Sequence, residues 1–263
     1  MGMDERERKL AVMELAMEAG QLLLENGAEI SRVSETMQRI CRHYGVESAS
    51  FFTLTNGILA SSGSDADPLY AKVSYIPVNS GRLDWVCAVN QLSREIESGC
   101  YTIVQAKEAL RQIRRMPGKK TGSTIAASAI AVAAFSLMFG GSWADCLASA
   151  FAGLFTQIFV IYVSNRYLSR IVGKLAGGAF VTFVCLLLQN FGPGQNLSNM
   201  IISTLMVLIP GVSFVNGIRD IASSDYLSGA VRVLDALLGF ACIAIGVAFC
   251  FMIYNRVFGG MIL

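Results

Sequence analysis

The chain has 263 residues, a formal net charge of +2 and a hydrophobic content of 54%. The net charge does not bear on a nucleic-acid partner, but no basic stripe with interleaved aromatic residues occurs, so we expect none. The charges are unevenly divided: residues 1–121 hold 15 basic and 15 acidic residues, whereas residues 122–263 hold 6 and 4. We therefore expect a soluble domain up to residue 121 and a membrane domain from residue 122 onward.

Residue types that carry out catalysis or bind metals are scarce. The seven cysteines form no CxxC pair, and the single histidine, His43, lies late in a predicted helix. No GxSxG, P-loop or HExxH motif occurs. We expect no metal, no cofactor and no catalytic residue, and hence no enzyme. A membrane-anchored hydrolase and a ligand-sensing regulatory subunit are the alternatives.

Residues 1–121 show the helical and strand periods that are typical of an α+β domain. Two amphipathic helices come first, and the earlier one should end near Asn26-Gly27, because glycine readily adopts the left-handed conformation that ends a helix. Asn56-Gly57 predicts a hairpin turn. The predicted strands cover residues 48–55, 58–61 and 70–76, and two more helices cover residues 85–99 and 102–113.

Residues 122–263 contain five apolar segments, which predict an all-α membrane domain of five transmembrane helices. Basic residues cluster at the junction and in the loops after the second and fourth segments. The positive-inside rule then places the N-terminal domain in the cytoplasm and the C-terminus outside a bacterial-type plasma (inner) membrane. The segments are residues 122–139, 143–164, 172–191, 198–218 and 232–254.

Small residues in the third segment indicate close helix packing. Gly173 and Gly177 lie four residues apart, a spacing that lets helix backbones approach each other in lipid. They fit either a tight bundle within one chain or a surface for a second membrane subunit, including another copy of this chain.

The fourth segment is interrupted at Pro210-Gly211, and Asn216 and Asp220 follow the interruption. Proline removes a backbone donor and glycine has a permissive backbone, so the helix should break there. A broken helix in a membrane often lines a wet cavity and marks a candidate transport site. The alternative is a helix that ends at Pro210 and is followed by a cytosolic loop.

Charged residues are rare in the membrane segments, so each one is a candidate for function. Asp145 lies two residues into the second segment, where it can reach interfacial water, and Asp235 lies about one turn into the fifth. Asp220 and Asp235 are candidates to carry a proton or contact a substrate. Alternatively, they form structural ion pairs with Arg219 and Arg232.

Several motifs occur in an order that resembles the threonine/serine exporter family, and in particular the long (YjjP-type) subunit of its two-component exporters. The most specific are Gly27-Ala28-Glu29, and Pro210-Gly211 with Asn216 and Asp220. The stretches that carry the resemblance are LLLENGAEISRV (22–33), Val78-Asn79, GGSWADCLASA (140–150), IPGVSFVNGIRD (209–220) and SGAVR (228–232).

The resemblance implies a secondary exporter of small polar metabolites, either amino acids such as threonine and serine or a dicarboxylate such as succinate. It also implies a short membrane subunit as partner, because full-length members have more spans than the five predicted here. Asn216 and Asp220 would then bind the substrate or relay a proton, with inward proton movement driving export.

Four further residues are expected to have gating or structural roles: Gly27, Glu29, Asp145 and Arg232. For Glu29 two interpretations stay open. It is either a carboxylate at a helix N-terminus, where the helix dipole stabilises it, or part of a gate at the cytoplasmic mouth.

Overall fold

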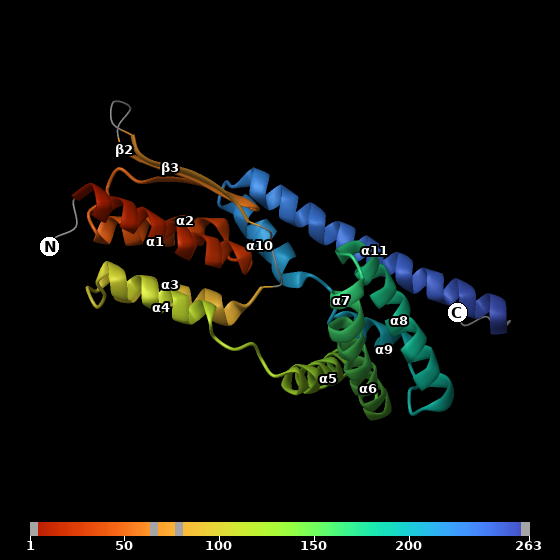
Figure 1. Ribbon diagram of the computed structural model, residues 1–263. Helices are drawn as coiled ribbons and strands as arrows, with labels where there is room; N and C mark the ends of the chain where they lie inside the picture. The colour runs from red at the N-terminus through yellow and green to blue at the C-terminus, as the bar shows by residue number, and fades with distance from the viewer. Residues whose placement is uncertain (1–4, 64–67, 77–80, 259–263) are drawn as a thin grey trace. The chain divides into compact units, whose positions relative to one another are not determined.

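The computed structural model (Figure 1) describes residues 5–63, 68–76 and 81–258, so the Val78-Asn79 motif lies outside the described residues. Its contacts divide the chain into two compact units. The first comprises Met1–Pro117 and Val212–Leu234, and the second comprises Gly118–Gly211 and Asp235–Leu263. The segment that follows the Pro210-Gly211 break therefore packs with the N-terminal residues.

The helices of the first unit enclose one hydrophobic core. The α1–α2 pair lies in the middle, and the α3–α4 pair covers one face of it (Figure 1). Because α1 is covered on both faces, its buried residues run almost continuously from Val12 to Leu24. The helices are α1 (Glu5–Glu25), α2 (Ile30–His43), α3 (Leu83–Glu97) and α4 (Ile103–Arg114).

A three-stranded antiparallel sheet, in the order β1-β2-β3, covers the other face of the α1–α2 pair (Figure 1). Ile58 and Ala60 alternate along β2 as its buried face. Leu54 pairs with Gly57, which places the turn at Thr55-Asn56, one residue earlier than the sequence predicts. The strands are β1 (Ser50–Leu54), β2 (Gly57–Gly63) and β3 (Pro68–Tyr75).

The second unit is helical. In the described part of the chain, four helical segments are long and apolar enough to cross a membrane: Thr121–Met138, Trp143–Tyr167, Arg170–Phe191 and Tyr226–Val257. The first and third are α5 and α8 (Arg170–Phe191), and the fourth lies in α11 (Tyr226–Phe258), which begins in the first unit. The second consists of α6 (Trp143–Phe159), the π-helix η1 (Val160–Ser164) and α7 (Asn165–Tyr167).

The predicted fourth transmembrane helix is not a single helix. It consists of α9 (Leu197–Leu205) and α10 (Gly211–Ala222), and neither is among the four candidate spans. Pro210 has no amide hydrogen with which to continue the helix. The break predicted at Pro210-Gly211 is therefore confirmed, and the structure shows four continuous candidate spans and one broken segment.

Glycines of α8 pack inside the second unit. A Cβ added at Gly173 would meet the Ser164 side chain, and one at Gly177 would meet Leu208. Their small size therefore permits contacts within this chain, the first of the two interpretations that the sequence left open. Large apolar side chains, such as Ile130 and Phe183, remain exposed on the candidate spans.

Candidate functional site

The backbone of the turn between α1 and α2 forms a Schellman motif. Gly27 has a φ of +76°, a left-handed conformation that glycine adopts without a steric penalty. Its amide donates to the Leu24 carbonyl (3.0 Å), and the Ala28 amide donates to the Leu23 carbonyl (3.1 Å). Helix α1 ends at Glu25, close to the predicted position. The carbonyls of Gly27 and Ala28 are thereby left for another partner.

A hairpin of α10 and the beginning of α11 supplies that partner. The two helices approach closely at Gly217 and Gly229: a Cβ on Gly229 would lie only 2.7 Å from the Gly217 carbonyl oxygen. The hairpin turn contains Ser224 at a φ of +69°. Within it, the Asp225 amide donates to the Asp220 carbonyl (2.9 Å).

Three side chains of this hairpin bind backbone groups of the α1–α2 turn. Asn216 Nδ2 donates to the Gly27 carbonyl (3.0 Å), and Arg232 Nη2 donates to the Ala28 carbonyl (2.8 Å). The Ile30 amide donates to Asp220 Oδ1 (3.2 Å) across 190 positions of sequence. We call this site the turn cluster, which consists of Gly27, Ala28, Glu29, Ile30, Asn216, Arg219, Asp220 and Arg232.

Asp220 caps helix α2 from a distant part of the sequence. Glu29 is the N-cap residue of α2, yet its side chain makes no capping hydrogen bond. The carboxylate of Asp220 takes that place at the first amide of the helix, where the helix dipole favours negative charge. Glu29 therefore lies at the helix N-terminus, as one of the two interpretations of the sequence expects, but the capping hydrogen bond comes from Asp220.

Asp220 and Arg232 form a buried ion pair. Asp220 is 0% exposed, and its Oδ2 lies 3.3 Å from Arg232 Nη1. That oxygen receives no hydrogen bond from the residues that the structure describes. Burial raises the pKa of the Asp220 carboxyl above its ordinary value, and the Arg232 charge and the Ile30 amide offset only part of the effect. Asp220 is thus a buried acid whose charge depends largely on one partner.

Glu29 lies at the rim of the turn cluster. Its Oε2 lies 3.2 Å from Arg219 Nη1 and 3.7 Å from Arg32 Nε, and Ser31 Oγ donates to Oε1 (3.1 Å). The side chains of both arginines are more than half exposed. Solvent therefore screens these ion pairs, and each contributes little to stability.

The other predicted site residues lie outside the turn cluster. Asp145 is buried in the second unit and accepts hydrogen bonds from backbone amides. Asp235 pairs with Arg170 (2.7 Å), and both side chains are substantially exposed. The sequence grouped Asp220 and Asp235 with Arg219 and Arg232 without assigning pairs; Asp220 pairs with Arg232, whereas the partner of Asp235 lies outside that group. Pro210 and Gly211 form the break ahead of α10.

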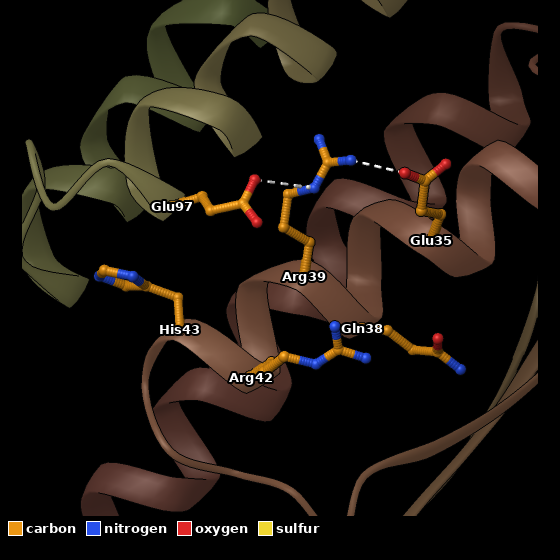
Figure 2. Close-up of a pocket in the computed structure, with 6 residues that line it drawn as sticks. All are labelled: Glu35, Gln38, Arg39, Arg42, His43 and Glu97. Carbon is orange, nitrogen blue, oxygen red and sulfur yellow. Dashed lines mark hydrogen bonds and ion pairs between the residues drawn. The ribbon is translucent and has the colours of Figure 1, made fainter.

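A hollow of about 320 Å³ lies beside α2 in the first unit (Figure 2). Arg39 lies between the carboxylates of Glu35 and Glu97, which bind it as ion pairs. His43 and Arg42 line the same hollow. Within the described residues, the ion pairs of this hollow are those of Arg39.

Sequence reasoning identified the side chains of the turn cluster but not their contacts. The partners of Asn216, Asp220 and Arg232 are backbone groups of the α1–α2 turn, and backbone groups leave no signature in residue types. Two buried hydroxyls of α6, those of Ser149 and Thr156, were also missed. A signal for them existed, since they lie seven residues apart in an apolar segment and thus on one helix face.

Comparisons with known proteins agree with these motifs. Residues 14–254 match a protein-family model, ThrE, described as "Putative threonine/serine exporter". The chain is also 22% identical over 245 residues to a Mycobacterium tuberculosis protein named "Probable threonine/serine exporter". That alignment covers 90% of this chain and 45% of the relative, so the chain spans less than half of the relative's length. No solved structure matches the chain.

Proposed function

Because the chain belongs to the threonine/serine exporter family, we propose that it is a subunit of a secondary exporter that moves small polar metabolites out of the cell. The family is one of transporters rather than enzymes, and the four apolar helices fit a multi-pass membrane protein. The observation that carries the proposal is that the family match includes both segments of the turn cluster. The proposed cargo is an amino acid of the threonine/serine type or a dicarboxylate such as succinate.

We propose that the Asp220–Arg232 pair couples export to a proton. A proton on Asp220 removes the negative charge that holds Arg232, and burial favours this neutral form. The freed guanidinium can then bind a carboxylate with two parallel hydrogen bonds. Every proposed cargo carries a carboxylate, so this step does not depend on which cargo is correct. Asn216, with both a donor and an acceptor, lies in the same cluster for polar contacts.

The proposed arrangement in the membrane follows the distribution of basic residues. The N-terminal domain is cytoplasmic, the C-terminus is outside, and the broken segment of residues 198–218, which ends before Asp220, provides a fifth crossing of the plasma (inner) membrane. The chain is the long, YjjP-type subunit, and a short membrane subunit of the same family is its partner. The exposed apolar side chains of the candidate spans are compatible with contact to lipid, to that partner or to a second copy of this chain.

A ligand-sensing role is the second candidate, and the hollow beside α2 favours it. Its lining combines Arg42 with the carboxylates of Glu35 and Glu97 (Figure 2). Arg39 pairs with both carboxylates, and Arg42 adds a further cation that can bind the carboxylate of a small ligand, such as a free amino acid. In this case the first unit would regulate transport in response to cytosolic amino acid.

The test is efflux of labelled threonine, serine and succinate from preloaded cells. The chain is expressed alone and together with a short membrane subunit of the family. We expect efflux of at least one of these compounds only in the pair, and loss of efflux in Asp220→Asn at matched protein level. Asp235→Asn, which alters an exposed ion pair, is the matched control and should retain efflux. No efflux of any compound from any combination would contradict the proposal.

A further inference from the structure

Two hydroxyl groups in the interior of the second unit lack the partners that such groups normally have. Ser149 and Thr156 of α6 are both 0% exposed. Neither Ser149 Oγ nor Thr156 Oγ1 has a hydrogen-bond partner among the residues that the structure describes. Two other buried hydroxyls of this unit are satisfied within their own helix: Ser203 donates to Asn199 O (2.7 Å) and Thr204 donates to Met200 O (2.7 Å).

This difference points to a function rather than to packing. Serine and threonine in a helix can return their hydroxyl to a carbonyl about one turn earlier, as Ser203 and Thr204 do. Buried polar groups without a partner are rare in native proteins, and a membrane interior makes them more costly. Alanine or valine would fill the same space without that cost, so retention of two such hydroxyls suggests that a ligand satisfies them.

The two residues belong to one polar row on the inner face of α6. At 100° per residue, Asp145, Ser149 and Thr156 fall within an arc of about 40°, and they extend over about 16 Å of the helix axis. Ala148 and Ala152 flank the row and pack against buried residues of α8 and α9. The row therefore faces the interior of the bundle instead of lipid.

A π-helix follows the row directly. The segment η1, Val160–Ser164, begins four residues after Thr156. Short π-helical segments inside α-helices are frequent at functional sites, because they shift the backbone out of its regular hydrogen-bonding pattern. The row thus leads from the capped N-terminus of α6, where Asp145 lies, toward a local irregularity of the same candidate span.

We propose that Ser149 and Thr156 line the substrate path and recognise the hydroxyl group of the cargo. This inference rests on the exporter function proposed above and narrows its substrate class. The candidate span from Trp143 has no charged residue between Asp145 and Arg166, so beyond Asp145 its inner row offers the neutral hydroxyls of Ser149 and Thr156. Such a lining suits a hydroxylated amino acid without net charge better than a dicarboxylate.

The experiment compares pairs of cargo that differ by a hydroxyl group: serine has one that alanine lacks, and threonine has one where valine has a methyl group. Efflux of serine against alanine, and of threonine against valine, is measured for the parent, Ser149→Ala, Thr156→Val and the double variant, each with the partner subunit. The parent should export the hydroxylated cargo faster than its counterpart. In the double variant the ratio of the two efflux rates should be roughly ten-fold lower. Thr156→Ser, which keeps the hydroxyl, should retain most of it.

A thermal melt of the same purified variants separates recognition from packing. Removing an unsatisfied buried hydroxyl should leave the melting temperature unchanged or raise it. Ser203→Ala is the matched control: it removes a satisfied hydroxyl, so it should lower the melting temperature slightly and leave the preference unchanged.

Three outcomes would overturn the inference. If the parent exports none of the four amino acids, the exporter proposal for this class fails and the inference fails with it. If the parent exports serine or threonine and the double variant keeps the parental preference, the inference alone is wrong. A double variant that loses stability and loses efflux of all four cargoes equally would show a packing role.

Discussion

The two units each contain a buried aspartate, and the two aspartates are bound in different ways. Asp145 of the second unit is 2% exposed, and its four hydrogen-bond donors all come from the backbone or from a hydroxyl. Asp220 of the first unit is equally buried but has one amide and one charged partner. Four neutral donors hold a carboxylate permanently, whereas a single ion pair is lost when the carboxylate takes up a proton.

We propose that this difference separates a structural carboxylate from a switchable one. Both aspartates follow sequence motifs of the same family, so the motif alone does not distinguish their roles. The number and charge of their partners distinguish the two roles. Substitutions at the two sites test whether this distinction holds.

The largest effect on stability is expected at Asp145. Asp145→Ala would leave the amides of Ser142, Gln195 and Asn196 without an acceptor. Each unsatisfied amide costs roughly 1–3 kcal/mol, and because these three bonds are only partly buried we take the lower end, a total loss of about 3 kcal/mol or more. We expect very little folded protein, measured by size-exclusion chromatography in detergent. An Asp145→Ala variant that accumulates and melts like the parent would contradict the structural role.

The next largest effect is expected for Arg232→Gln, which leaves Asp220 buried without its charged partner. Breaking a buried ion pair from one side typically costs about 3–5 kcal/mol. Adding Asp220→Asn removes the unpaired charge, so the double variant should regain part of the lost melting temperature. Strictly additive losses in a double-mutant cycle would show that the two side chains do not interact.

A smaller effect is expected in the pH dependence of stability. Because burial raises the pKa of Asp220 in the folded state, the folded state holds this proton at pH values where the unfolded state has lost it. The stabilising contribution of Asp220 to the free energy of unfolding is therefore fully present below its pKa in the unfolded state. It is lost as the pH rises through its pKa in the folded state. Melting temperatures from about pH 4 to pH 7 should show this loss in the parent. Asp220→Asn should lack it, and an identical pH profile would refute the assignment.

The smallest effect is expected at the rim of the turn cluster. Arg219→Gln removes an exposed arginine from Glu29, and such a change costs less than about 1 kcal/mol. Melting temperature and efflux should both remain close to the parental values. A loss of efflux as large as that of Asp220→Asn would place a functional charge at the rim, on Arg219 or Glu29, and would contradict the account.

The sequence predicted much of the fold because the relevant forces are local. Periodicity located the helices and strands, glycine located the end of α1, and proline located the break before α10. The turn cluster was different, because Asn216 and Asp220 bind backbone groups about 190 positions away. No local pattern records such a contact, and the same holds for the pairing of Asp235 with Arg170.

The most direct test is the initial rate of efflux per folded molecule for Asp220→Asn and Asp145→Asn, each measured with the partner subunit. If Asp220 is the switchable carboxylate, Asp220→Asn should fold and lose at least about ten-fold in this rate, which corresponds to about 1.4 kcal/mol. Asp145→Asn should yield less folded protein, but each folded molecule should export at close to the parental rate. Parental efflux per molecule in Asp220→Asn would contradict the account.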